Sequence, residues 1–475
     1  MIKQNEILSF SITKVSKCIQ NGEISPVELV ENLLNHLDQV DPILNSFITV
    51  NREEAIKEAI EMENEIKQGN YKGPLHGIPI GIKDNINTKG MKTTSGSEIY
   101  KDYIPEKDAF VIERLKEAGA VIFGKHNTHE VALGTTGDRS HYGAVKNPYN
   151  TTRMTGGSSS GSAAAVAACL SYGAIGTDAG GSIRLPASFC GIVGMKPTYG
   201  TVSKRGMYPI SWIQDHVGPM TRTVHDNALI LNAISGFDSE DPDAIYRKPE
   251  DFTRLIGKDI KGTSIGVPSN FYFEDLNEEI SKKVEEAITI LEALGVRITR
   301  VALPNIEKFL DAQRVILSSD AYAINREGLE GFPDLWDDEV KERLLTGRYI
   351  RGFEYATALQ TRKLAKKEFN DVFEKVDVIL TPTTSILPPR INERFIGNDQ
   401  NAIVVRQIIS KQTSPTNLNG FPSLALPCDF SSEGLPIGIQ FIGKEWEEAK
   451  LYQFGYALEQ ELSLTTAKLN INHLP

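Results

Sequence analysis

Residues 153–225 read RMTGGSSSGSAAAVAACLSYGAIGTDAGGSIRLPASFCGIVGMKPTYGTVSKRGMYPISWIQDHVGPMTRTVH. This stretch holds a Gly-Ser loop, a helix of small residues and a second turn, Gly-Gly-Ser, that ends at Ser182. Apolar segments flank both turns, so the pattern indicates ordered turns rather than flexible linkers. Two glycines before Ser182 allow several backbone amides to turn toward one point, which is what an oxyanion hole requires.

Helix and strand patterns alternate on both sides of this stretch. Ser25, Pro26 and Glu28 form a capping box that begins a helix running to about residue 40. Further helices are predicted at 109–119, 159–173, 278–294 and 353–374, and strands at 77–85, 120–125, 264–268, 376–381, 423–427 and 437–442. The alternation predicts the α/β class, as a single large α/β/α sandwich whose mixed, twisted central sheet is covered by helices on both faces.

No stretch has the composition of a linker, and no repeat of 20–50 residues is present. We therefore expect one domain over residues 1–475, with a core at approximately 75–225. Between 300 and 352 the pattern breaks into short helical pieces, which we interpret as a cap-like insertion. This cap and the segment 395–415 are expected to shape the pocket.

Composition excludes several classes of function. The net charge of −11 gives no electrostatic basis for binding nucleic acid, and no basic amphipathic segment favours a membrane surface. The four cysteines form no CxxC pair, and the N-terminus lacks the apolar core of a secretory signal. The run 162–170 is too short to span a bilayer. We expect a cytoplasmic protein.

A different nucleophile also fits a short motif. Ser159 is the central serine of GSSSG at 157–161, which matches the G-x-S-x-G elbow of α/β-hydrolases. The elbow needs a buried strand upstream and a histidine partner, and neither is evident. Ser159 therefore stays the second candidate. His126 and His129 lie three residues apart without a H-E-x-x-H motif, so no metal site is predicted.

The quoted stretch resembles the signature of the amidase signature hydrolases. GGSSSGSAAAVAA followed by GTDAGGSIRLPASFCGIVGMKPTYG carries the resemblance, and GIPIGIKDN, LTPTT and GLPIGIQFIG extend it from about residue 10 to about 460. The resemblance implies the family's fold and a hydrolase that acts on linear carbon–nitrogen amide bonds. It implies an acyl-enzyme intermediate, a small-molecule amide substrate, and neither an organic cofactor nor a metal.

The resemblance also assigns residues. It implies a Ser–cis-Ser–Lys triad of Ser182 as nucleophile, Ser158 as bridging serine and Lys83 as base. The backbone amides of Ala179, Gly180, Gly181 and Ser182 would form the oxyanion hole. The chemistry agrees, because Lys83 ends an apolar strand, where desolvation lowers the pKa of an ammonium group. Asp178 and Arg184 are expected to form a structural ion pair.

Within the family, the chain most resembles the A subunits of glutamyl-tRNA(Gln) amidotransferases, with departures. The resemblance puts Arg362 at the position that binds the glutamine carboxylate. Ser410 stands where that subgroup usually has an aspartate, and SSDAYAINREGLEG does not match its SNLxRFDG stretch. We therefore predict a stand-alone amidase. The alternative is a glutaminase that works with B and C subunits of the amidotransferase. A homo-oligomer is compatible with either.

Overall fold

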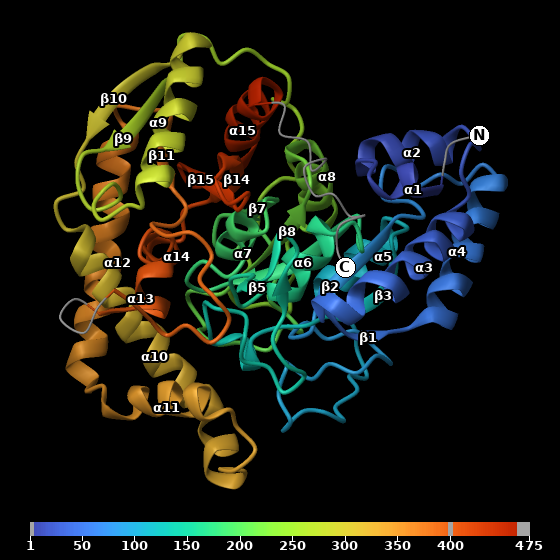
Figure 1. Cartoon of the computed structure of the whole chain (residues 1–475), viewed down its shortest axis with the longest axis horizontal. Coiled ribbons are helices and arrows are strands. Elements are labelled where there is room, and N and C mark those ends of the chain that lie inside the picture. The colour runs from blue at the N-terminus through green and yellow to red at the C-terminus, as the bar shows by residue number, and fades with distance from the viewer. Residues whose placement is uncertain (1–3, 398–401, 463–475) are drawn as a thin grey trace.

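The computed structural model describes residues 4–397 and 402–462 (Figure 1). In this part of the chain, eleven strands form one sheet in the order β1-β3-β2-β6-β8-β7-β14-β15-β11-β9-β10. Its strands are β1 (Phe47–Val50), β2 (Pro79–Lys83), β3 (Val121–His126), β6 (Gly173–Asp178), β7 (Val193–Lys196), β8 (His216–Thr221), β9 (Ser264–Pro268), β10 (Arg297–Val301), β11 (Val378–Pro382), β14 (Ser423–Phe430) and β15 (Pro436–Gly443). Two further two-stranded sheets pair β4 (Lys146–Asn147) with β5 (Asn150–Met154) and β12 (Phe395–Ile396) with β13 (Ile403–Val404).

Helices occur throughout the described residues. They are α1 (Gln4–Leu8), α2 (Ile12–Gln20), α3 (Pro26–Leu44), α4 (Arg52–Lys67), α5 (Phe110–Glu117), α6 (Ser160–Ala167), α7 (Arg184–Phe189), α8 (Val224–Ile234), α9 (Glu278–Ala293), α10 (Ile306–Gly331), α11 (Asp338–Thr346), α12 (Gly352–Phe373), α13 (Val405–Ile409), α14 (Ser414–Asn419) and α15 (Glu448–Leu462), with 3-10 turns η1 (Glu130–Ala132) and η2 (Gly347–Tyr349). The predicted start of α3 is confirmed, because the Glu28 amide donates to Ser25 Oγ at 3.0 Å.

The sheet is mixed, as predicted. Strand β2 runs parallel to both β3 and β6, whereas β6, β8 and β7 pair in antiparallel fashion. Carboxyl ends of parallel neighbours meet at one edge of a sheet, and this is where β2 ends at Lys83 and β6 ends at Asp178. The chain segments that follow these strands are therefore brought together.

Helices cover both faces of the sheet, which confirms the predicted sandwich. Adjacent residues of a strand point to opposite faces, and β6 shows this directly. Ile175 belongs to the main apolar core, which also contains residues of α3, α5, α8, α9 and α15. Ala174 packs in a separate core with residues of α6 and α7. The small residues of α6 fit this second core, where that helix contacts β2, β3, β6 and β8.

The region 300–352 differs from its prediction in one respect. About half of it is a single helix, α10, which spans 26 residues rather than several short pieces. Buried polar residues, among them Gln313, Asp320 and Asn325, interrupt its apolar pattern, and this explains the difference. Figure 1 shows α10 beside α12, with α11 at its C-terminal end. The single-domain organisation and the cap-like role of this region stay predictions.

Candidate active site

Lys83 is completely buried at the end of β2. Its Nζ lies 2.7 Å from Ser158 Oγ and 2.7 Å from Thr177 Oγ1. Ser158 follows a cis Gly157–Ser158 peptide bond and is also completely buried. Burial lowers the pKa of Lys83 to about 7, against the opposing effect of the Asp178 and Asp215 carboxylates. A substantial fraction of Lys83 is therefore neutral near pH 7 and able to accept a proton.

Ser182 lies in the turn between β6 and α7. The backbone amide of Ser159 donates to the Ser182 carbonyl at 3.2 Å, which holds the two glycine-rich turns together. The Asp178 carboxylate organises this turn, because it accepts the Gly181 and Ile183 amides at 2.7 and 3.1 Å. Arg184 donates to both oxygens of Asp178, from Nη2 at 3.0 Å and from Nε at 3.1 Å.

The environment of Asp178 and Arg184 confirms the predicted structural ion pair. Burial raises the pKa of Asp178, but Arg184 outweighs this effect and holds that pKa below its usual range. Arg184 also donates to Thr416, Asn417 and Gln440, at 2.7–3.1 Å. The turn that carries Ser182 is thus fixed by a buried network of hydrogen bonds.

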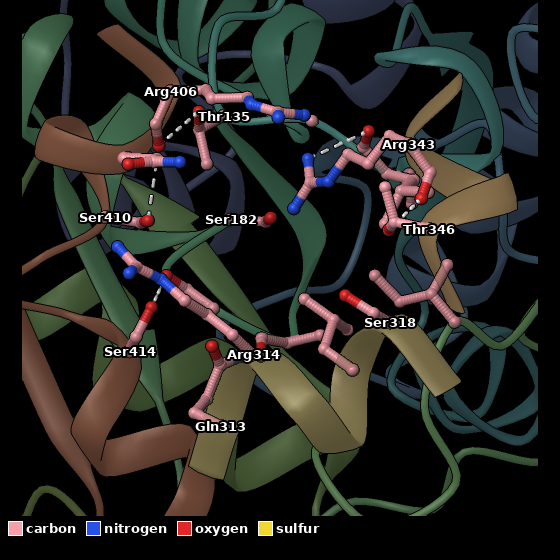
Figure 2. A pocket seen from close by; sticks show the side chains of 18 residues that line it. Thr135, Ser182, Gln313, Arg314, Ser318, Arg343, Thr346, Arg406, Ser410 and Ser414 are labelled. Carbon is pink, nitrogen blue, oxygen red and sulfur yellow. Dashed lines mark hydrogen bonds between the residues drawn. The ribbon is translucent and has the colours of Figure 1, made fainter. Parts of the chain in front are cut away.

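A cavity of about 180 Å³ opens beside Ser182 (Figure 2). The Ser182 side chain keeps a small exposure of 7%, whereas Ser158 and Lys83 have none. Ala179 and Gly180 line the same cavity. A reactant in this cavity would therefore meet Ser182 and the adjacent turn, whereas Ser158 and Lys83 do not line the cavity.

The chain matches the family described as Amidase over residues 28–452. The chain belongs to the amidase family. It is 36% identical to the A subunit of the glutamyl-tRNA(Gln) amidotransferase of Halothermothrix orenii, over 98% of this chain and 99% of the relative. These matches confirm the resemblance seen in the sequence, and the protein is an amide-cleaving hydrolase.

Solved structures share the fold of this amidase. One, described as a vestigial protein complex that reveals the evolutionary origins of an s-triazine catabolic enzyme, has a TM-score of 0.91 and 30% identity, covering 95% of this chain and 98% of that chain. The peptide amidase from Stenotrophomonas maltophilia has a TM-score of 0.82 and 33% identity, covering 95% and 97%. Within the described residues of the amidase, no helix is long and apolar enough to cross a membrane.

One expectation for the oxyanion turn needs correction. The resemblance predicts that all four amides of residues 179–182 face the reacting carbonyl. In the structure, the Gly181 amide is already bonded to Asp178 Oδ1. The amides of Ala179, Gly180 and Ser182 have no such internal bond among the described residues, and they remain the candidates for this amidase.

The expected role of Arg362 in binding a carboxylate stays a prediction. It lies on α12, where Nε donates to the Leu418 carbonyl at 2.9 Å and the guanidinium stands 5.8 Å from the Tyr199 ring centroid. Arg362 is not among the residues that line the Ser182 cavity. This geometry is that of a packing contact between α12 and α14, so it does not support the expected role in binding a substrate carboxylate.

The other candidates are also placed by the structure. Ser159 is completely buried, and its hydroxyl bonds the Thr177 backbone, donating to the carbonyl at 3.2 Å and accepting from the amide at 3.3 Å. The Ser159 hydroxyl is thus already used in hydrogen bonds that stabilise the fold of the amidase. His126 and His129 are buried, and no cluster of histidine, cysteine and carboxylate ligands suited to a metal occurs among residues 4–397 and 402–462.

Sequence reasoning missed several site residues of the amidase. Thr177, which holds Lys83, precedes the strand end by one residue and matches no motif that we used. Arg314, Arg343 and Arg406 line the cavity and come from three separate helices. The regions 300–352 and 395–415 were expected to shape the pocket, and these arginines confirm that expectation without having been singled out.

Proposed function

We propose that the protein hydrolyses an amide through an acyl-enzyme on Ser182, with Ser158 as proton relay and Lys83 as base. The observation that carries this proposal is the 2.7 Å contact between Lys83 Nζ and Ser158 Oγ, both fully buried, next to the Ser159 amide that donates to the Ser182 carbonyl. A serine hydroxyl is a weak nucleophile unless a base takes its proton. Lys83 is suited to that task because burial brings its pKa to about 7.

The first half of the reaction forms the acyl-enzyme. Ser182 Oγ attacks the amide carbonyl carbon, its proton passes to Ser158 Oγ, and the Ser158 proton passes to Lys83. The oxygen of the tetrahedral intermediate accepts hydrogen bonds from the backbone amides of Ala179, Gly180 and Ser182, in a turn that Asp178 holds in place. Collapse of the intermediate breaks the carbon–nitrogen bond, and the relay returns a proton to the leaving ammonia or amine.

The second half releases the acid. A water molecule attacks the Ser182 ester while the same relay takes its proton. Collapse of this second intermediate restores the Ser182 hydroxyl and frees a carboxylic acid. The reaction requires only groups of this chain and water.

A second candidate function is that of the ammonia-releasing A subunit of a glutamyl-tRNA(Gln) amidotransferase. Sequence similarity favours this function over a stand-alone amidase, because the relative from Halothermothrix orenii carries that name and matches over nearly its full length. In this case the chain would act on glutamine and assemble with B and C subunits. The buried free cysteines fit a reducing cytoplasm under either function.

The cavity lining favours the stand-alone amidase. Glutamine carries an ammonium group, which a protein site usually meets with a carboxylate. No aspartate or glutamate lines the Ser182 cavity, and Ser410 stands at its wall in place of the aspartate expected from the resemblance. The two functions therefore differ in whether the preferred substrate carries an ammonium group, which an assay can measure.

The test is ammonia release by the purified single chain from glutamine and from amides that lack an ammonium group. A stand-alone amidase hydrolyses one of the latter without partners. The Ser182→Ala variant is the control for contaminating activity. A chain that is silent alone, co-purifies with B and C subunits and then releases ammonia from glutamine would establish the second function instead.

A further inference from the structure

Three guanidinium groups surround the cavity in front of Ser182. Arg314 comes from α10, Arg343 from α11 and Arg406 from α13, and Figure 2 shows their side chains around the space that Ser182 faces. All three line the same cavity, and the charge of Arg406 lowers the pKa of both Arg314 and Arg343, although burial is the larger cause for each. For Arg343 the two effects bring the pKa to about 10.

These charges lack matching carboxylates within the described residues. No aspartate or glutamate lines the cavity. Arg314 has one distant partner, Asp311 at 4.0 Å, and both of these side chains are well exposed to solvent. Arg343 donates to the uncharged Leu133 carbonyl at 3.2 Å, and Arg406 forms no ion pair with a described residue.

Two arginines near the cavity, unlike those that line it, have close carboxylate partners. Arg394 donates to both oxygens of Asp138, at 2.9 and 3.0 Å, and to Glu339 at 2.6 Å. Arg139 shares Glu339 at 3.1 Å. The charge of Glu339 raises the pKa of Arg343. Glu339 is nevertheless paired with Arg139 and Arg394, and it makes no ion pair with Arg343 within 4.0 Å. Apart from the distant Arg314–Asp311 contact, the cavity arginines thus lack the carboxylate partners that Arg394 and Arg139 have among the described residues.

Positive charges that are held close together in a partly buried position destabilise the fold unless an anion binds between them. Guanidinium groups bind carboxylates with paired, directional hydrogen bonds. We propose that Arg314, Arg343 and Arg406 form the specificity site for a small amide that carries a carboxylate group and no ammonium group. This inference rests on the proposed function of Ser182 only for the position of the scissile bond.

The size of the site narrows the substrate class. A cavity of about 180 Å³ is smaller than the pockets that hold drug-sized ligands, which span roughly 300–1,000 Å³. The absence of a lining carboxylate disfavours a zwitterion such as glutamine. The class that fits both properties is the monoamide of a short dicarboxylic acid.

A matched set of amides tests the class. Malonamate, succinamate and glutaramate are compared with propanamide, butanamide and pentanamide, in which a methyl group replaces each carboxylate. Glutaramate is also glutamine without its ammonium group. We expect the best acid to exceed its neutral counterpart by at least about tenfold in kcat/KM, as charge-assisted hydrogen bonds imply. Glutaramate should also exceed glutamine. Neutral amides that equal the acids at every length, or glutamine ahead of glutaramate, would overturn the inference.

Substitution of the arginines tests the assignment. Arg314→Gln and Arg406→Gln should each lower the acid-to-neutral ratio of kcat/KM by about tenfold. Neither guanidinium donates a hydrogen bond to a described residue, so these variants should fold. The matched control is Arg351→Gln, since Arg351 is exposed on the surface and paired with Glu354. An unchanged ratio in both cavity variants, or an equal loss in the control, would contradict the assignment.

A binding measurement separates this inference from the proposed chemistry. Malonate, succinate and glutarate are titrated calorimetrically into Ser182→Ala and into Ser182→Ala with Arg406→Gln. We expect at least one dicarboxylate to bind and to lose about tenfold in affinity in the double variant. If a dicarboxylate binds but no acid amide is hydrolysed, the proposed function is contradicted and the specificity site is supported. If neutral amides are hydrolysed but no dicarboxylate binds, the specificity site is contradicted and the proposed function is supported.

Discussion

Lys83 Nζ and Ser158 Oγ lie 2.7 Å apart, and solvent reaches neither side chain. A charged ammonium group in this position would lose its hydration, and no carboxylate of the described residues contacts Lys83 directly to replace it. The neutral amine is favoured for this reason, and its lone pair is free to receive the Ser158 proton. The placement of one lysine at a buried strand end thus supplies a base at neutral pH.

Activity should depend on the protonation of Lys83. Because its pKa is about 7, the active neutral form is lost as the pH falls through that value. The kcat/KM for a neutral amide should therefore fall about tenfold per pH unit below the pKa. The measurement is a profile of kcat/KM from about pH 5 to about pH 9, on either side of that pKa. Lys83→Ala should remove most of the activity with the fold intact, and Lys83→Arg should also be inactive, because guanidinium stays protonated. A flat acid limb or an active Lys83→Arg variant would contradict the lysine base.

Thr177 should tune that same pKa. Its Oγ1 accepts a hydrogen bond from Lys83 Nζ at 2.7 Å, which favours the ammonium form. Thr177→Val removes the acceptor at nearly constant volume, so the acid limb should move to lower pH by up to about one unit. The pH profile of this variant measures the shift. Thr177→Ser keeps the hydroxyl and should restore the wild-type limb, whereas a shift to higher pH in Thr177→Val would refute this role.

Loss of Arg184 should destabilise the fold. Arg184→Met leaves the Asp178 carboxylate buried without its partner and removes donors to Thr416, Asn417 and Gln440. Breaking a buried pair in this way costs about 3–5 kcal/mol in the free energy of unfolding. Urea denaturation compares Arg184→Met with Arg351→Met, whose solvent-exposed pair with Glu354 should contribute far less to the free energy of unfolding. Equal stability of the two variants would show that the pair does not hold the turn.

Arg362 should affect all substrates alike. Its Nε bonds the Leu418 carbonyl between α12 and α14, away from the residues that line the cavity. Arg362→Ala should therefore lower the midpoint of thermal unfolding and change KM for glutaramate and pentanamide by the same factor. The two KM values, measured side by side, decide the question. A selective rise in KM for glutaramate would restore a role in carboxylate binding.

Local sequence patterns were sufficient to single out the three residues that we propose for the relay. Lys83 ends an apolar strand, and Ser158 and Ser182 follow pairs of glycines, so each is marked by its immediate neighbours. The long match to one family then placed all three in the same site. The cavity arginines have no such mark. Arg314, Arg343 and Arg406 meet only because α10, α11 and α13 pack around one space, and no spacing along the chain encodes that meeting.

Some elements of the fold also depend on tertiary contacts. Strand β8 lies between β6 and β7 although it contains Pro219, which lacks the amide that a central strand normally uses. Helix α10 contains buried Gln313 and Asp320, which bond the Ala179 carbonyl and the Ser211 hydroxyl, respectively. These polar contacts are satisfied only in the folded protein. A prediction from the pattern of apolar residues alone therefore split this helix into short pieces.

The identity of the acylated residue tests the central claim most directly. The wild-type protein is treated with a fluorophosphonate, digested and analysed by mass spectrometry, with Lys83→Ala as the control for activation by the base. We predict one adduct, on Ser182, that forms much more slowly in Lys83→Ala. An adduct on Ser159, or labelling of Ser182 at the same rate in both proteins, would contradict the account.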